Sequence, residues 1–367
     1  MIPRITCRIC SEHRPPTGRV DVVHLTRKAL LLCVCFLVLM TEQPPAAPTP
    51  TAKTTPLPRR APALRPGDTV GLVAPAGAIA ESVFDQVASR LARRGFSVIS
   101  FIATPRRGYL AADDPSRLDA LNRAIHASEV KAILCMRGGY GTPRLLDGVD
   151  YEALKKNPKI IIGYSDITAL LTAIQRRTGI VVFHGPMGQE FVGVSGPNLT
   201  PRARDYFWKT LSGDMPPSPS WVKPPRVRSL VDGVAEGRLT GGNLSMISST
   251  LGTPYEIDTR EAILFLEDVN EKSFRIDRML AQLRLAGKLR EVRGIILGSF
   301  VNCGPAGNKS LSLNDVFLDY FYALGVPVVQ GYPAGHGLRD HLVLPLGETV
   351  RVDATRATIS ILHRPVD

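Results

Sequence analysis

The 367-residue sequence predicts an α/β protein in which a parallel-sheet domain is followed by a mixed α/β or barrel-like domain. From Arg65 onward, short apolar runs alternate with amphipathic stretches of about 10–15 residues, the pattern of βαβ units. The composition, with 44% hydrophobic and 21% charged residues, is typical of a globular protein. The length is sufficient for two domains of ~100–200 residues each.

The first predicted domain spans residues 65–190 and contains strands that alternate with helices. Because a helix separates most neighbouring strands, the strands are expected to pair in parallel. The predicted strands are Thr69–Ala74, Ser97–Phe101, Lys131–Met136, Lys159–Gly163 and Ile180–Phe183, and the predicted helices are Ser82–Arg94, Pro115–Ala127 and Ile167–Arg177.

Residues 191–230 are predicted to be a linker, because they contain the Pro-rich stretch Met215–Pro225, and residues 231–367 form the second predicted domain. This domain has more strands and glycine turns than the first, which favours a mixed or barrel-like sheet. Its predicted elements are strands Ala262–Glu267, Gly294–Gly298 and Val326–Gln330, helices Arg275–Ala286 and Leu313–Leu324, and a strand-rich tail, Leu342–Leu362.

Residues 1–60 are predicted to be a leader. Arg27 and Lys28 precede a 12-residue apolar run, Ala29–Met40, and a Pro-rich stretch follows to about Thr55. A basic region, a short apolar region and a polar exit are typical of a secretory signal, so we expect export to the periplasm or cell envelope, with membrane association only through the leader. Two alternatives stay open: a tail that targets nothing, and a cytoplasmic protein whose true start lies further along the chain.

Charge and cysteine content exclude several function classes. The leader holds nine basic and three acidic residues, which supplies half of the net charge of +12. No dense basic run with interleaved aromatic residues remains, so we expect no nucleic-acid binding. Only Cys135 and Cys303 lie in the body, each within or beside an apolar run, and they are interpreted as core thiols. Without a His-Glu-x-x-His motif, neither a metal nor a cofactor is expected.

Ser165 is the candidate nucleophile. The apolar strand Lys159–Gly163 runs into Gly-Tyr-Ser-Asp and a helix follows at once, which places the hydroxyl above the sheet. The backbone N–H of Asp166 then lies where an oxyanion could form. The motif is not Gly-x-Ser-x-Gly, since Ile167 occupies the second glycine position. The alternative is that Ser165 or Asp166 only caps the helix.

Glycines near the end of another predicted strand provide a candidate second oxyanion donor. In Arg-Gly-Gly-Tyr-Gly, residues 137–141, three glycines in four residues let the backbone approach a ligand or adopt positive φ. The N–H of Gly139 is the candidate donor. The spacing does not match a dinucleotide-binding fingerprint. A tight turn without chemical function is the alternative.

An acid and a histidine complete the candidate site. Glu267 and Asp268 end an apolar strand, and His336 lies between two glycines that leave its imidazole uncovered. Nucleophile, acid and base then follow in the order of a serine hydrolase triad. His184, which follows the strand Ile180–Phe183, is the competing base. Acids in a solvated loop and an ordinary loop histidine are the alternatives, and Asp268 is expected to be a surface or loop-capping carboxylate.

Six motifs in the same order resemble those of the LD-carboxypeptidase family, which also includes the microcin C immunity proteins. The resemblance extends from Gly67 to about Leu362 and does not include the leader. The motifs are Arg-Gly-Gly-Tyr-Gly, Gly-Tyr-Ser-Asp-Ile-Thr, Phe-His-Gly-Pro-Met, Gly-Gly-Asn-Leu, Phe-Leu-Glu-Asp and Gly-His-Gly.

This resemblance implies a Rossmann-like N-terminal domain and a C-terminal domain of the swivelling-barrel type. It implies Ser165 as nucleophile, Glu267 as triad acid and His336 as base, with the N–H groups of Gly139 and Asp166 as the oxyanion hole. The implied activity is release of the terminal D-alanine from murein tetrapeptides through an acyl-enzyme.

The resemblance also implies a homodimer without a cofactor. Tyr140 and Asn243, which belong to two of the motifs, are expected to contact the substrate. A related serine amidase that acts on peptidyl-nucleotide antibiotics is an alternative, in which Trp208 or Trp221 would supply an aromatic specificity residue. The other alternative is a non-catalytic Rossmann-like binding module in which Ser165 is a helix cap.

Overall fold

The computed structural model describes residues 58–194, 198–216, 227–307 and 309–367. The predicted leader up to residue 57 lies outside these ranges, as do Trp221 and most of the Pro-rich stretch. Within the described ranges, no helix combines the length and the hydropathy that crossing a bilayer requires.

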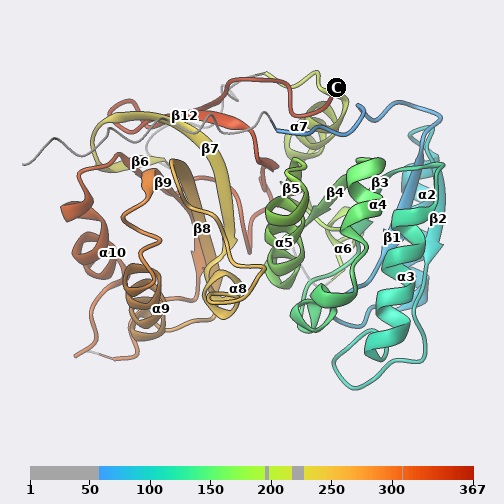
Figure 1. Ribbon diagram of the computed structural model, residues 1–367, viewed down its shortest axis with the longest axis horizontal. Helices are drawn as coiled ribbons and strands as arrows, with labels where there is room; N and C mark the ends of the chain where they lie inside the picture. The colour runs from blue at the N-terminus through green and yellow to red at the C-terminus, as the bar shows by residue number, and fades with distance from the viewer. Residues whose placement is uncertain (1–57, 195–197, 217–226, 308) are drawn as a thin grey trace, which may run out of the picture. The chain divides into compact units, whose positions relative to one another are not determined.

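The first sheet has six strands in the order β11-β5-β4-β3-β1-β2 (Figure 1). The strands β1 to β5 pair in parallel, as the alternation of strands and helices predicted, and β11 pairs antiparallel with β5. The strands are β1 (Thr69–Val73), β2 (Ser97–Phe101), β3 (Val130–Cys135), β4 (Ile160–Gly163), β5 (Val182–His184) and β11 (Leu344–Leu346). The helices between and after them are α2 (Glu81–Ala92), α3 (Asp114–His126), α4 (Tyr151–Lys156), α5 (Thr168–Thr178), α6 (Gly188–Val192) and α7 (Pro201–Ser212), with 3₁₀ helices η1 (Thr142–Gly148) and η2 (Ser165–Ile167).

The second sheet has seven strands in the order β13-β12-β7-β8-β9-β10-β6 and is curled into a half-barrel (Figure 1). Its four central strands, β7 to β10, are parallel, and the outer strands are antiparallel. The barrel-like prediction is thereby confirmed. The strands are β6 (Arg228–Val231), β7 (Val234–Asn243), β8 (Ala262–Val269), β9 (Val292–Val301), β10 (Val328–Gln330), β12 (Thr349–Asp353) and β13 (Thr358–Ile361). The helices are α8 (Leu244–Ser249), α9 (Ser273–Leu285), α10 (Leu313–Phe321) and the 3₁₀ helix η3 (Tyr322–Leu324).

Helix α5 lies between the two sheets (Figure 1). Its residues from Thr168 to Ile174 are all buried, unlike those of an ordinary amphipathic surface helix. Leu170 on α5 belongs to the same hydrophobic cluster as Leu239 of β7 and Phe265 of β8. The helix that begins beside the candidate nucleophile is therefore packed against both halves of the protein.

The chain returns to the first sheet after it has entered the second. Strand β11 follows the second-sheet strand β10 in sequence but pairs with β5 of the first sheet. At the end of the chain, Asp367 exchanges backbone hydrogen bonds with Ala61 and Ala63. The body is thus one compact unit in which the two sheets share segments.

The predicted linker, residues 191–230, contains helix α7 in its described part. Thr200 caps this helix by accepting a hydrogen bond from the N–H of Ala203. Tyr206, Phe207 and Leu211 form a buried face at helical spacing. Phe207 and Leu211 belong to the same hydrophobic cluster as residues of α2 and α6, and Tyr206 belongs to the cluster that both halves share, so the segment is part of the core rather than a spacer.

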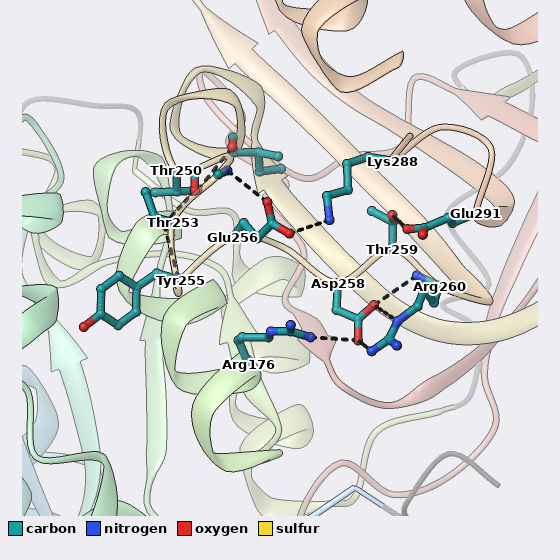
Figure 2. A network of polar contacts seen from close by, with 12 residues as sticks. Arg176, Thr250, Thr253, Tyr255, Glu256, Asp258, Thr259, Arg260, Lys288 and Glu291 are labelled. Atoms are coloured by element: carbon teal, nitrogen blue, oxygen red, sulfur yellow. Dashed lines mark hydrogen bonds and ion pairs between the residues drawn. The ribbon is translucent and has the colours of Figure 1, made fainter. Parts of the chain in front are cut away.

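A polar network fastens residues 250–261 of the second half to α5 (Figure 2). The Asp258 carboxylate accepts hydrogen bonds from Arg176 of α5 at 3.2 Å and from Arg260 at 2.7 Å. The hydrogen bonds from Arg260, with the charges of Arg238 and Arg260, lower the pKa of Asp258 to about 2, although burial opposes the shift. On the same segment, the Tyr255 hydroxyl donates to Asp147 at 2.6 Å. These contacts hold the two halves in register at a distance from the strand ends that carry the site.

The two cysteines of the body are buried free thiols, as predicted. Burial raises the pKa of both Cys135 and Cys303 to about 12. Neither thiol is ionised at neutral pH, so neither is an activated nucleophile.

Candidate active site

Ser165 occupies a sharp turn between β4 and α5. Its φ of +62° lies in the left-handed region that L-residues rarely adopt. A Cβ on Gly163 would lie 2.7 Å from Cγ2 of Ile167, and a Cβ on Gly138 would lie 2.9 Å from Cβ of Ser165. The turn therefore needs one glycine two residues before the serine and another on the neighbouring strand end. Ile167 occupies the position that is glycine in Gly-x-Ser-x-Gly, and it fits there because Gly163 has no side chain to collide with it.

The helix-cap alternative does not match the contacts of this turn. The N-cap of α5 is Ile167, and no side chain caps the helix. The Asp166 carboxylate is buried and accepts from the backbone N–H of Thr142 at 2.8 Å and from the Thr142 hydroxyl. Burial raises the pKa of this carboxyl despite these bonds. Asp166 thus ties the nucleophile turn to η1, while the Ser165 hydroxyl is left to a different partner.

That partner is His336. Its Nε2 lies 3.0 Å from Oγ of Ser165, although 171 positions separate the residues. Its Nδ1 lies 2.7 Å from Oε2 of Glu267, and its backbone N–H donates to the same oxygen at 3.2 Å. Ser299 of β9 donates to the carbonyl of His336 at 2.9 Å and so holds the loop from the other side. The structure brings all three predicted triad side chains into one hydrogen-bonded chain.

The strand ends explain how the three side chains meet. Ser165 follows the carboxyl end of β4, Glu267 lies near the carboxyl end of β8, and His336 lies in the loop that follows β10. Carboxyl ends of parallel strands meet at one edge of a sheet, where open α/β folds place their ligands. The edge of the first sheet that carries Ser165 faces the edge of the second sheet that carries Glu267 and His336.

Asn243 contributes a contact that the sequence did not reveal. It was predicted to bind substrate, but its side chain is buried and engaged within the protein. The amide nitrogen donates to Oε1 of Glu267 and to Oδ1 of Asp268, both at 3.2 Å, and the amide oxygen accepts from the N–H of Met246. The nearby Gly241 lets β7 lie close enough for this contact, because a Cβ on Gly241 would lie 1.9 Å from the carbonyl oxygen of Phe265.

The charges of His336 and Glu267 stabilise each other. Burial alone would lower the pKa of His336, but the Glu267 carboxylate outweighs it and raises the pKa above its ordinary value. Burial would likewise raise the pKa of Glu267, and the imidazole and Asn243 lower it overall. The buried carboxylate is thus ionised at neutral pH and favours the imidazolium that forms when His336 accepts a proton.

Asp268 is not the surface or loop-capping carboxylate that we expected. It is 2% exposed, and it accepts from the backbone N–H and the hydroxyl of Ser245 at 2.9 and 2.8 Å. Burial, with the charge of Glu267, raises its pKa to about 6. Among the described residues, Asp268 has no hydrogen bond to His336, and its side chain anchors the first turn of α8 instead.

His184, the competing base, has no access to Ser165. It is fully buried, and its ring packs edge-on against Tyr164 and Phe265. Burial lowers the pKa of His184 to about 3, so the imidazole is neutral. Within the described residues, neither of its ring nitrogens has a hydrogen-bond partner. His336 is therefore the base that geometry selects.

Two backbone N–H groups lie beside the nucleophile. Gly139 has φ of +112° and is exposed, and among the described residues its N–H donates to no protein group. A Cβ on Gly139 would lie 3.1 Å from Cα of Gly77, so the turn packs directly on the loop after β1. With the N–H of Asp166, which follows the serine, this donor could hold an oxyanion.

Of the aromatic residues expected near the site, Tyr140 is exposed and Trp208 is packed against other rings. Tyr140 is 67% exposed and forms an edge contact with the 64% exposed Tyr109 at 5.8 Å, so both rings are free to contact a substrate. Trp208 is packed instead among Phe96, Phe191 and other aromatic rings. The described contacts of Trp208 are therefore packing contacts. In the described part of the chain no cluster of acidic, histidine or cysteine side chains is placed to hold a metal ion.

Comparison with known proteins places this geometry in a family. Residues 70–185 match the LD-carboxypeptidase N-terminal domain, and residues 236–352 match the LD-carboxypeptidase C-terminal domain. A "probable murein peptide carboxypeptidase" of Bacillus subtilis is 41% identical over 306 residues, which cover 82% of this chain and 93% of that protein.

Two solved structures share the fold. A structure of MccF in complex with glutamyl sulfamoyl guanosine has a TM-score of 0.74 at 27% identity, covering 84% of this chain and all of that one. The muramoyltetrapeptide carboxypeptidase from Oxalobacter formigenes has a TM-score of 0.67 at 30% identity, covering 79% and 97% of the two chains. The chain belongs to the LD-carboxypeptidase family, and it is a serine carboxypeptidase.

Proposed function

We propose that this enzyme releases the terminal D-alanine from murein tetrapeptides by an acyl-enzyme mechanism. The observation that carries the proposal is the continuous hydrogen-bonded chain from Ser165 through His336 to Glu267. The substrate class comes from the relatives, one named for murein peptides and one for muramoyltetrapeptide.

In this mechanism His336 takes the proton of the Ser165 hydroxyl as the oxygen attacks the scissile carbonyl. Glu267 accepts the hydrogen bond of Nδ1–H and so fixes the tautomer whose Nε2 is free to act as base. The N–H groups of Gly139 and Asp166 hold the oxyanion, each contributing ~10²–10³ in rate. The imidazolium then protonates the departing amine of D-alanine, and a water activated by His336 hydrolyses the acyl-enzyme.

Incubation of the purified protein with murein tetrapeptide tests the proposal. We expect one equivalent of D-alanine and the tripeptide, detected by mass spectrometry, and no release with Ser165→Ala. Release of another fragment, or none, from a protein that an active-serine probe labels would contradict the proposed substrate.

A second candidate is amidase action on a peptidyl nucleotide. The observation that favours it is the similarity to MccF, whose structure contains glutamyl sulfamoyl guanosine. Hydrolysis of glutamyl sulfamoyl guanosine should be measured with the same preparation. A kcat/KM on this compound above that on tetrapeptide would reverse the order of the two candidates.

We further propose that the mature enzyme acts in the periplasm or cell envelope as a homodimer, with any membrane association made through the leader. The support for export is the basic and apolar pattern between Arg27 and Thr55. The support for the dimer is the family resemblance. Cell fractionation and light scattering test the two statements, and a full-length protein found only in the cytosol would contradict export.

A further inference from the structure

A carboxypeptidase must distinguish a peptide that ends in a free carboxylate from one that continues. Removing a carboxylate from water is costly unless a cation or several N–H donors receive it. Arginine suits this task because its planar guanidinium can donate two parallel hydrogen bonds to one carboxylate. An arginine that binds the terminal carboxylate should therefore lie beside the nucleophile and have N–H groups that no protein group occupies.

Arg137 lies directly beside the nucleophile turn. It precedes Gly138, whose Cβ position is 2.9 Å from Cβ and 3.1 Å from Oγ of Ser165. The Arg137 side chain runs past the loop after β1, where its Nε lies 3.5 Å from the Cβ position of Gly77. The same turn thus presents its backbone to the serine and its guanidinium to the adjacent loop.

The guanidinium of Arg137 is only partly engaged. Nη1 donates to the carbonyl oxygen of Ala78 at 2.7 Å, which leaves four of the five N–H groups of an arginine. Within the described residues no carboxylate lies at ion-pair distance from it, and the side chain is half-buried. Its positive charge is therefore uncompensated at the edge of the site.

The neighbouring Arg117 provides a contrast. It is buried, and it binds the Asp114 carboxylate at 2.6 Å and the carbonyl oxygen of Gly141 at 3.1 Å. Its charge is neutralised and its geometry fixed, so it has a structural role. Two arginines border the glycine turn, and of the two only Arg137 has no carboxylate partner among the described residues.

We propose that Arg137 binds the terminal carboxylate of the substrate and thereby makes the enzyme a carboxypeptidase rather than an endopeptidase. The inference rests on the proposed function, because it concerns the leaving D-alanine of that reaction. Gly139, two residues after Arg137, is exposed and has no side chain that could cover the turn. Arg137 acts on specificity and takes no part in proton transfer.

The alternative is that Arg137 only tethers the loop after β1 through Ala78. Steady-state kinetics separate the two roles if two substrates are compared: murein tetrapeptide with a free terminal carboxylate, and the same peptide as its D-alanine methyl ester. The variants are Arg137→Gln, Arg137→Lys and, as a matched control for the loss of one charge, Arg106→Gln. Arg106 is exposed and bonds only the carbonyl of Gly108 among the described residues.

For Arg137→Gln we expect kcat/KM on the free acid to fall by about 10- to 100-fold, mainly through KM, with little change on the ester. Arg137→Lys should retain part of the preference for the acid, because it keeps the charge without the bidentate geometry. Arg106→Gln should match the wild type on both substrates. Labelling by an active-serine probe and the melting temperature should be unchanged in all variants.

If Arg137→Gln lowers kcat/KM equally on the free acid and on the ester, the inference is overturned and Arg137 only tethers the loop after β1. Should Arg137→Gln fail to fold, the acid-to-ester ratio of Arg137→Lys decides, and a ratio equal to that of the wild type overturns the inference as well. A wild-type enzyme that releases no D-alanine would instead defeat the proposed function, and this inference with it.

Discussion

The backbone of Gly335 lies directly against the carboxylate of Glu267. A Cβ at Gly335 would be 2.6 Å from Oε2 of Glu267 and 2.6 Å from Oγ of Ser299. The same Oε2 receives both hydrogen bonds from His336. The residue before the histidine must therefore be glycine for two reasons, its φ of +112° and the space that the triad acid occupies.

Gly335→Ala should consequently lower kcat by ~10²-fold or more, since it displaces the acid that orients the imidazole. Gly252→Ala is the control, because Gly252 also has positive φ but nothing lies within 4 Å of its Cβ position. The control should lose about 1 kcal/mol of stability and no activity. Equal activity of the two variants in steady-state assays would show that the contact is unimportant.

Ser165→Ala should abolish turnover without lowering the melting temperature. The small hydroxyl contributes little packing, and the one group that loses its partner, Nε2 of His336, belongs to a side chain that is only partly buried. The measurement is D-alanine release beside thermal unfolding, and a variant that keeps more than about a hundredth of the wild-type rate argues against a serine nucleophile. Chelators should leave the wild type unaffected.

Neighbouring carboxylates should behave differently when neutralised. Glu267→Gln should lower the rate by ~10²–10⁴ with modest effect on stability. Asp268→Asn should cost about 1–3 kcal/mol of stability, because an amide nitrogen would then face the donors of Ser245, and it should affect the rate less. Rates and urea unfolding of both variants check the assignment, and the opposite pattern would place the triad acid one residue later.

The pH dependence of kcat/KM should show an acid limb with its midpoint above 6.5, the ordinary pKa of histidine. His336 must be neutral to act as base, and Glu267 raises its pKa, so activity rises as pH increases through that value. In Glu267→Gln the residual limb should move to lower pH, because the charge that raises the pKa is gone. Initial rates from about pH 5 to about pH 9 measure both midpoints.

The network around Asp258 should contribute to stability in a pH-dependent way. Its pKa of about 2 in the folded state lies below the unfolded value of ~3.9, so the contribution is present above about pH 4 and is lost as pH falls toward 2. Allowing for partial exposure, we expect Asp258→Asn to cost about 1 kcal/mol at neutral pH and less at about pH 3. Glu236→Gln, which removes an exposed pair with Arg351, is the control and should cost nothing measurable in urea unfolding.

The parallel first sheet was predictable from sequence because its strands are short apolar runs separated by helices, and β2 begins and ends at the predicted residues. Strand ends and glycines marked Ser165, Glu267 and His336 only as candidates, and the resemblance to the family selected them as a triad. Helix α7 was missed because the Pro-rich stretch dominated the composition of residues 191–230, although Tyr206, Phe207 and Leu211 already had helical spacing.

The roles of Asn243 and Asp268, the polar residues next to Glu267, could not be predicted, because they depend on the register between strands. Asn243 lies opposite Glu267 in the pairing of β7 with β8, and nothing in the local sequence specifies that pairing. Burial of Asp268 has the same origin: α8 folds back over the end of β8 and covers it. Consecutive residues on a strand point to opposite faces, so the sequence predicted that one acid would face the histidine but not what the other would bind.

Strand β11 has a consequence for how the chain can be synthesised and divided. Its partner β5 lies about 160 positions earlier, so the backbone groups along the open edge of β5 stay unpaired until almost the whole polypeptide has left the ribosome. A fragment that ends before Leu344 would keep that edge exposed and would be prone to intermolecular strand pairing. Removal of the second half therefore should not yield a soluble first half, and a split enzyme should work only if the cut leaves β11 with the piece that carries β5.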